Sequence, residues 1–185
     1  MTGIVTGLLP EFPGLEGHRL PSVPPCILRP ARLADLPFLR ELYRSFRKDE
    51  LAPIPWSQDD KQAFLDQQFN FQHRYYAAAF PQADFLIIEK DGTSVGRLYI
   101  DLRADIWHII DIGFLTEWRG QGLGSATLKA IQDAATTGQS LGIALHVDRN
   151  NRRAYELYQA FGFMVTETSD THIGMEWRPL LTGGT

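Results

Sequence analysis

With 185 residues, of which 44% are hydrophobic and 22% charged, the chain has the size and composition of one soluble globular domain. Its formal net charge of -4 gives no support to a nucleic-acid or anionic-membrane partner, and the single cysteine excludes an internal disulfide. No stretch has the pattern of a signal peptide or the length of a membrane span, so we expect a cytoplasmic protein.

The first 25 residues are rich in glycine and proline, which predicts an extended or partly ordered arm before a single domain over residues 26–180. A short strand is expected at CILRPAR, where Cys26 would be a buried structural thiol. Asp35 is then expected to cap a helix over LPFLRELYRSFR, whose apolar residues recur at helical spacing. Ser57 and Asp60 resemble a capping box at the start of a second helix.

Strands and helices alternate in the rest of the chain. Asp91 and Gly92 predict a hairpin between FLIIEK and SVGRLYIDLR. The segment DIWHIIDIGFL is almost continuously apolar, as expected of a strand inside a sheet that is covered on both faces. A helix from Gly122 to about Thr137, a strand at IALHV, a helix at NRRAYELYQAFG and a strand pair at FMVTET and THIGMEW follow. The order β-α-α-β-β-β-α-β-α-β-β predicts an α/β fold with a mixed sheet flanked by helices.

The stretch EWRGQGLGSATL, residues 117–128, places three glycines between a strand and a helix. Backbone N–H groups in such a loop and the positive end of the helix dipole favour phosphate, and Arg119 adds a forked donor. The Gly-Lys-Ser/Thr run of a P-loop is absent, and Gly124 is one position early for a dinucleotide fingerprint. The pattern Arg-x-x-Gly-x-Gly remains; the alternative is that the glycines only shape a tight turn.

A second motif, NRRAYELYQAFGF at residues 151–163, follows about thirty residues later. The two motifs in this order of elements resemble the GNAT superfamily of N-acetyltransferases, over residues 27–178. The resemblance implies a GNAT-like fold and transfer of an acetyl group from acetyl-CoA to a primary amine by direct attack in a ternary complex. No covalent enzyme intermediate is expected, since no cysteine or serine stands beside a base. No metal is expected either, because the five histidines show no paired spacing with carboxylates or thiols.

The resemblance also implies the residues that hold the cofactor. Loop amides would bind the pyrophosphate, the end of the strand would pair with the pantetheine arm, and one face of the later helix would contact acetyl-CoA. The loop residues are Arg119, Gly120, Gln121, Gly122, Leu123, Gly124 and Ser125, the strand residues are Phe114, Leu115 and Thr116, and the helix residues are Asn151 and Ala154.

Tyr158 matches the tyrosine that this family places near the thioester sulfur, where a phenol can protonate the departing thiolate. On spacing alone, Tyr158 would be a core aromatic. The amine must lose a proton before attack, and the resemblance draws the base from the central strand, where His108 and Asp111 are polar. In a regular strand these two face opposite sides of the sheet, and either could be structural. Glu117, at an exposed turn, is the third candidate.

The acceptor is expected to be a small-molecule amine or a protein amine, and the charged ends of the first two helices do not define it further. Arg149, Arg152 and Arg153 lie beside the expected groove, where they would meet the nucleotide end of CoA or simply be solvated. Trp177 near the late strands is compatible with a homodimer. Two rival functions fit the same sequence: an acyl-CoA-binding sensor or assembly module without turnover, and a transferase that uses a different acyl donor.

Overall fold

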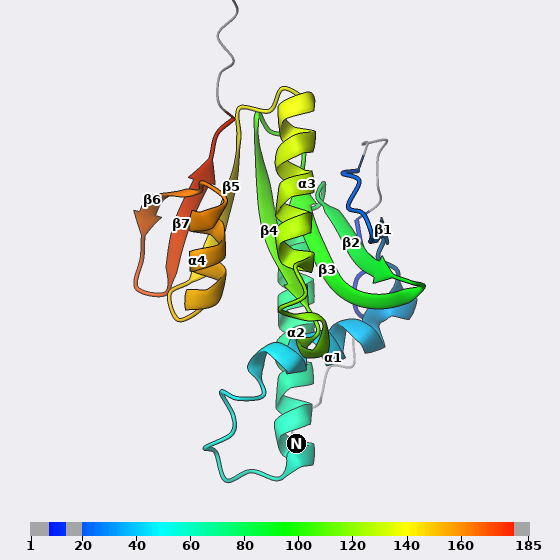
Figure 1. Ribbon diagram of the computed structural model, residues 1–185. Coiled ribbons are helices and arrows are strands. Elements are labelled where there is room, and N and C mark those ends of the chain that lie inside the picture. Colours follow the sequence, from blue (N-terminus) through cyan, green and yellow to red (C-terminus); the bar gives the residue numbers. More distant parts are fainter. Residues whose placement is uncertain (1–7, 14–19, 180–185) are drawn as a thin grey trace, which may run out of the picture.

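The computed structural model describes residues 8–13 and 20–179. Figure 1 shows its elements in chain order, and this order is the predicted one with two short 3₁₀ turns added. The elements are β1 Ile27–Pro30, η1 Leu33–Asp35, α1 Leu36–Arg47, α2 Gln58–Ala79, β2 Asp84–Lys90, β3 Thr93–Asp101, β4 Ile106–Phe114, η2 Thr116–Trp118, α3 Leu123–Thr137, β5 Gly142–Asp148, α4 Arg152–Ala160, β6 Met164–Thr168 and β7 His172–Trp177.

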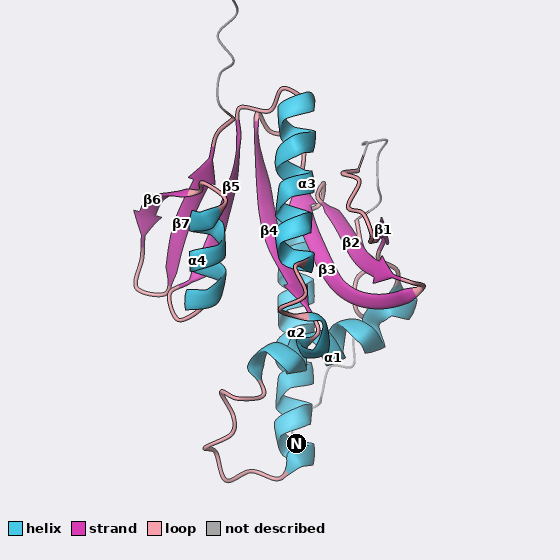
Figure 2. Cartoon of the chain, viewed as in Figure 1, coloured by secondary structure: helices cyan, strands magenta, loops and turns pink. Residues whose placement is uncertain are grey.

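The strands form one seven-stranded sheet in the order β1-β2-β3-β4-β5-β7-β6. The β4–β5 pair is parallel and the other pairs are antiparallel, which confirms the expected mixed sheet. Helices cover both of its faces (Figure 2). The strands inside the sheet therefore bury both faces, which explains why their sequences are apolar without alternation.

Two apolar clusters lie on the two faces of the sheet. Leu86 and Ile88 of β2 pack in one cluster with residues of α3 and α4. The alternate residues Phe85 and Ile87 pack in the other with residues of α1 and α2. Side chains of successive strand residues point to opposite faces, so a single strand supplies both clusters.

β4 and β5 pair over a short stretch and then separate. Their register runs from Ile106 opposite Gly142 to Ile109 opposite Leu145. Beyond that point β4 continues along β3 to Phe114, while β5 continues along β7 to Asp148 (Figure 1). The divergence leaves the free half of β4 without a neighbour on its β5 side.

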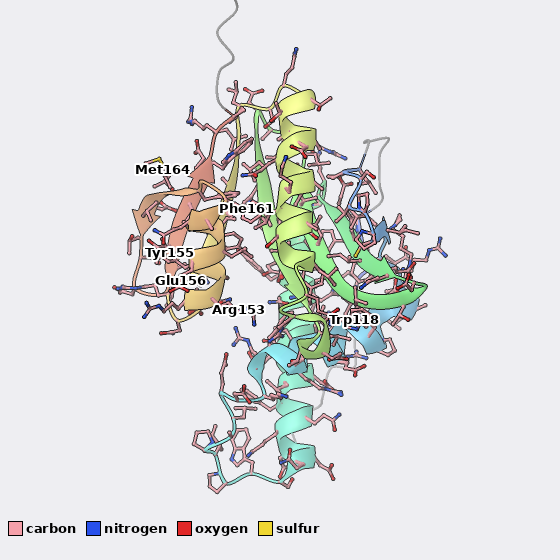
Figure 3. All side chains as sticks on the ribbon, viewed as in Figure 1. Trp118, Arg153, Tyr155, Glu156, Phe161 and Met164 are labelled. Atoms are coloured by element: carbon pink, nitrogen blue, oxygen red, sulfur yellow. The ribbon has the colours of Figure 1, made fainter. Side chains whose placement is uncertain are left out.

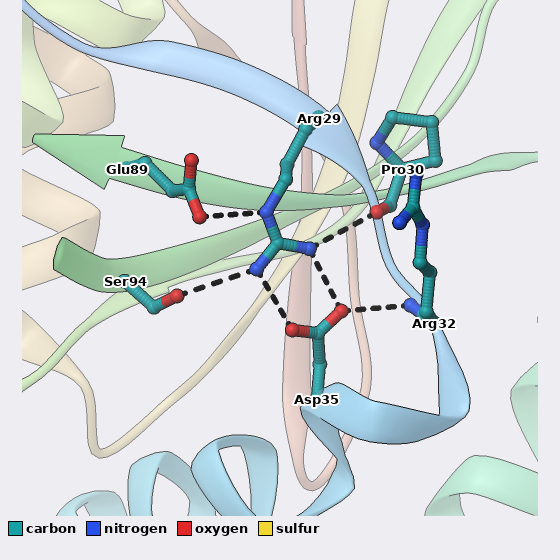
Figure 4. Close-up of polar contacts among 6 residues, drawn as sticks. All are labelled: Arg29, Pro30, Arg32, Asp35, Glu89 and Ser94. Carbon is teal, nitrogen blue, oxygen red and sulfur yellow. Dashed lines mark hydrogen bonds and ion pairs between the residues drawn. The ribbon is translucent and has the colours of Figure 1, made fainter. Parts of the chain in front are cut away.

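The start of α1 differs from the expected cap. Asp35 precedes the helix, but its side chain makes no hydrogen bond that caps α1. Its carboxylate accepts instead from the Arg32 amide at the start of η1 and, through both oxygens, from the guanidinium of Arg29, at 2.8 Å each. Arg29 Nε also donates to Glu89 at 2.6 Å, so one guanidinium ties β1 to β2 and to the start of α1 (Figure 4). The hydrogen bonds from Arg29 lower the pKa of Asp35. Ser57, in contrast, caps α2 as predicted, by accepting from the Asp60 amide.

Part of the expected N-terminal arm packs on α2, while its residues 1–7 and 14–19 lie outside the described residues. The ring of Phe12 lies 4.6 Å from the ring of His73, whose Nε2 lies 2.7 Å from the Pro10 carbonyl oxygen. A carbonyl only accepts, so Nε2 carries the proton. Burial lowers the pKa of His73, which favours the neutral imidazole. Cys26 is buried, as predicted.

None of the helices in the described part of the chain has the length and apolar character of a membrane span.

Candidate functional site

A cavity of about 1520 Å³ lies where β4 and β5 separate, and it is lined by residues from both faces of the sheet. A single small-molecule site is typically about 300–1,000 Å³, so this volume suits two substrates side by side. Of the residues expected to form the site, those that line the cavity are His108, Asp111, Phe114, Arg119, Gly120, Gly122, Leu123, Gly124, Ser125, Asn151, Ala154 and Tyr158.

Three of the expected residues do not line the cavity. Leu115 is 7% exposed and belongs to the cluster beneath α1. Thr116 begins the η2 turn and is exposed. The side chain of Gln121 is exposed and its Nε2 donates to the Glu117 carbonyl at 2.7 Å, which braces the turn. The carboxylate of Glu117 is likewise absent from the cavity wall, so its geometry does not support a role as the base.

The glycine loop places backbone amides at one end of the cavity. Gly120 and Gly122 have φ angles of 76° and 80°, a region that disfavours residues with a Cβ. α3 begins at Leu123, and its first helical bond runs from the Ala126 amide to the Gly122 carbonyl. The amides of the first three helical residues therefore have no helical partner. Together with the helix dipole they form a site for an anion.

Two arginines add positive charge at this end. Arg119 Nε donates to the Phe114 carbonyl at 2.8 Å, so its guanidinium is partly engaged rather than a free fork. Burial and then the charge of Arg153 lower the pKa of Arg119. Arg153 extends from α4 toward the loop, where its Nη2 lies 3.7 Å from the place that a Cβ on Gly120 would take (Figure 3). Two cations this close together favour an anionic ligand between them.

The free half of β4 presents an open strand edge. The Leu115 amide donates to the Val95 carbonyl at 3.0 Å, which marks a bonded pair of the β3–β4 ladder. Bonded and non-bonded pairs alternate in antiparallel ladders, so the backbone N–H groups of Ile112 and Phe114 point away from β3. On that side β5 has already separated, and an extended ligand can pair there like an added strand.

The expected face of α4 carries a structural role and a chemical one. Asn151 Oδ1 accepts from the Ala154 amide at 3.2 Å and caps the helix. Tyr158 is 8% exposed and its ring packs 5.8 Å from the ring of Phe163. Burial, and then the charge of Asp111, raise the pKa of Tyr158 well above its usual range. The phenol therefore keeps its proton at neutral pH and can donate it.

A β-bulge brings both candidate bases to one face of the sheet. Tyr99 faces Asp111 while Ile100 faces Ile109, which leaves one extra residue on β4. The expectation of opposite faces assumed a regular strand and is wrong. The ring of His108 contacts Phe80, and Asp111 accepts from Tyr76, so both point toward α2.

His108 lies beside a second histidine that sequence reasoning missed. Its ring is 5.8 Å from the ring of His146 on β5, and His146 Nε2 lies 2.9 Å from Glu167 Oε1. Burial and then His146 lower the pKa of His108, which keeps this imidazole neutral and able to accept a proton. The signal for His146 was its place in IALHV, a polar residue in an apolar strand.

Arg97 is another residue that sequence reasoning missed. Its side chain is 1% exposed, and its Nη2 donates to Asp111 Oδ2 at 2.6 Å. A lone cation inside the apolar strand TSVGRLYID was the available signal. The ring of Phe46 lies beneath both Arg97 and Arg119, at 5.8 and 5.1 Å from their guanidinium carbons. Gly113 makes room for this ring, because a Cβ there would lie 2.3 Å from it.

Among residues 8–13 and 20–179, no group of three or more histidine, cysteine or acidic side chains is placed to hold a metal ion.

Comparisons with known proteins agree with this geometry. The model of the "Acetyltransferase (GNAT) family" matches residues 38–163. A putative [ribosomal protein bS18]-alanine N-acetyltransferase from Bacillus subtilis (strain 168) is 33% identical over 82 residues, 44% of this chain and 54% of that protein. Mycothiol acetyltransferase from Streptomyces coelicolor is 33% identical over 92 residues, 48% of this chain and 29% of that protein.

The chain thus spans about half the length of the first relative and under a third of the second. The crystal structure of PaiA N-acetyltransferase from Thermoplasma acidophilum, in complex with coenzyme A, has the same fold. Its TM-score is 0.63 at 20% identity, over 83% of this chain and 99% of that one. The family model matches more than half of the chain, and the glycine loop lies where two parallel strands diverge, so the chain belongs to the Acetyltransferase (GNAT) family.

Proposed function

We propose that the chain is an acetyl-CoA-dependent N-acetyltransferase that acts on a primary amine by direct attack in a ternary complex. One observation carries this proposal. A single cavity joins the anion site of the glycine loop to the phenol of Tyr158 and to the neutral imidazole of His108. The anion site, a proton donor and a proton acceptor are the three parts that this reaction needs.

Acetyl-CoA fits the loop end through its charge and its shape. The amides at the start of α3, with Arg119 and Arg153, would hold the pyrophosphate. The pantetheine arm would pair with the open edge of β4 at Ile112 and Phe114, which places the thioester deeper between β4 and β5. Asn151, which already caps α4, has its amide nitrogen left for the cofactor, and the small side chain of Ala154 leaves room beside it.

The remaining groups would perform the transfer. An amine arrives protonated and is not a nucleophile until His108 takes one proton. The amine nitrogen then attacks the thioester carbonyl, the carbon–sulfur bond breaks, and Tyr158 donates its proton to the departing thiolate. The nitrogen releases its second proton as it becomes the amide nitrogen, and this proton returns to the oxygen of Tyr158. Asp111 is the second candidate for the base. The Bacillus subtilis relative is named as a putative alanine N-acetyltransferase of ribosomal protein bS18, so the acceptors to test first include peptides that begin with alanine.

Calorimetric titration with acetyl-CoA, with ATP and NAD as controls, tests the cofactor. Micromolar binding of acetyl-CoA alone supports the proposal, and its absence in a folded protein overturns it. A panel of small amines, amino acids and alanine-starting peptides, followed by release of CoA, then tests the reaction. Tight binding of acetyl-CoA without turnover on any member would favour the sensor, and turnover only with a longer acyl-CoA would favour another donor.

A further inference from the structure

A charged pair lies in the cavity wall on the side of α1 and α2. Both residues line the cavity, but the side chain of Arg97, on β3, is 1% exposed, whereas the side chain of its partner Asp111, on β4, is 16% exposed. The anion is therefore the more accessible member of the pair to a ligand that enters.

Stability does not account for this pair. A buried guanidinium is costly unless its N–H groups are bonded, and replacing a buried ion pair by apolar side chains is often neutral or stabilising. Arg97 Nη2 donates to Asp111 and to Gln72, but Nε and Nη1 are buried and have no hydrogen-bond partner among the described residues. The rings of Phe46 and Tyr99, at 5.8 and 5.1 Å, compensate in part. A charge kept at this cost beside a cavity indicates a role in the site.

The contacts of Asp111 are unequal on its two oxygens. Oδ2 accepts from Arg97 Nη2 at 2.6 Å and from the Tyr76 hydroxyl at 3.3 Å. Neither contact uses Oδ1. Two donors on one oxygen fix the plane of the carboxylate, and an ionised carboxylate accepts at both oxygens. Oδ1 is therefore an oriented acceptor for a donor in the cavity.

We propose that Asp111 binds the ammonium group of the acceptor through Oδ1, and that Arg97 is the positioning residue that holds this carboxylate in its orientation. The inference rests on the proposed function, because it takes the acceptor to be an amine. His108, on the same face of β4, removes the proton: one ammonium N–H bond breaks, a new N–H bond forms on the imidazole, and the electron pair stays on the amine nitrogen. In this step Asp111 takes up no proton, so it is an anchor and not the base.

The anchor is testable without acetyl-CoA. Butylammonium chloride, 1-butanol and sodium chloride are each titrated into the full chain, and the amide NMR signals of Asp111 and Gly113 are followed. Butylammonium is expected to shift both signals along a saturable curve, and neither 1-butanol nor sodium chloride at equal ionic strength should do so. Asp111→Asn should abolish the effect and Arg97→Met should weaken binding about tenfold, as loss of a charge-assisted contact implies. Equal shifts with butylammonium and 1-butanol, or an unaltered response in Asp111→Asn, would overturn the proposal.

Steady-state kinetics with the amine found in the panel separate anchor from base. Asp111→Asn should raise the KM for the amine roughly ten- to a hundredfold and leave kcat within about threefold and the KM for acetyl-CoA unchanged. The amine KM of the double variant R97M/D111N should rise no more than that of D111N alone, because Arg97 acts through Asp111. Arg97→Lys keeps the positive charge, so its amine KM should lie between those of the unmodified chain and of Arg97→Met. A fall in kcat with an unchanged amine KM, or additive losses in the double variant, contradicts the inference.

A milder variant guards against misfolding of the charge variants. Tyr76→Phe removes one donor from Asp111 Oδ2 and leaves both charges in place, and it should raise the amine KM several-fold. An unchanged amine KM in this variant would count against the inference. Failure of the proposed function would give a different result, namely that the unmodified chain does not bind acetyl-CoA. The butylammonium titration contains no acetyl-CoA, so the two failures can be told apart.

Discussion

The two ends of the cavity differ in the kind of chemical group that lines them. The loop end is formed mainly by backbone groups, namely the amides at the start of α3 and the open edge of β4 at Phe114, to which Arg119 and Arg153 add positive charge. The opposite end consists of side chains, with His108, Asp111 and Arg97 at its centre. A backbone site needs glycines and a helix start, whereas a side-chain site needs particular residues held by particular neighbours. The two ends should therefore respond differently to substitution and to pH.

The largest effect is expected at the backbone end. Gly122→Val places a β-branched residue at a φ of 80° and costs about 1–2 kcal/mol of strain, or else moves the amides at the start of α3. Losing two or more charge-assisted contacts should weaken acetyl-CoA binding by about 100-fold, measured by calorimetry. Gly92→Val is the matched control, since Gly92 has a φ of 76° with open space around it in the β2–β3 hairpin. It should lose similar stability and keep its affinity; equal losses of affinity would remove the distinction.

Tyr158→Phe comes next, and it probes the junction of the two ends. Loss of the phenolic proton should lower kcat about 100-fold and leave the KM for acetyl-CoA nearly unchanged. Tyr155→Phe is its control on the same helix, because the Tyr155 hydroxyl accepts from Gln159 instead of facing the cavity. If both variants kept full activity, the phenol would be a core group, as its spacing alone allowed.

A smaller effect, on pH, should appear only at the side-chain end. His108 must be neutral to accept a proton, and burial lowers its pKa, so activity should persist below the ordinary histidine value of about 6.5 before it falls. The acid limb of kcat/KM should disappear in His108→Gln, with kcat lower by about tenfold. Acetyl-CoA binding should change little over the same range. A parallel acid limb in acetyl-CoA binding would contradict the separation of the two ends.

The smallest expected effect is on the pH dependence of stability, and it separates the effect of acid on the fold from its effect on activity. The pKa of His73 is lowered in the folded chain, so the unfolded chain binds more protons below about 6.5 and stability falls as the pH drops through that region. His73→Gln should flatten this dependence in thermal unfolding, because no imidazole is left to titrate there. The acid limb of kcat/KM should remain in this variant. Its disappearance would show that acid acts on activity through the fold and not through His108.

The difference between the ends also explains how much the sequence could predict. Glycine spacing between a strand and a helix is a local pattern, so the loop and the order of elements were predictable from EWRGQGLGSATL and its flanks. The side-chain end depends on pairings between distant segments. The bulge opposite Tyr99 reversed the expected facing of Asp111, and no local pattern signals it. Asp35 is a second residue whose role depends on a distant segment, since its carboxylate bonds to Arg29 of β1 and not to the start of the helix that follows it.

The ring of Phe46 is shared by both ends, and this has a thermodynamic consequence. It lies against Arg97 and against Arg119, in the space that Gly113 leaves open. A ligand that shifts one of the two guanidinium groups moves the Phe46 ring against the other guanidinium. Binding of either substrate should therefore change the affinity for the other substrate by the same factor. The first substrate to bind would then change the shape of the binding site for the second. In Phe46→Leu this coupling should be weaker, so the affinity for each substrate should depend less on whether the other is bound, in titrations done in either order. Under the proposed function, the order in which the chain binds its two substrates would depend on the packing of Phe46.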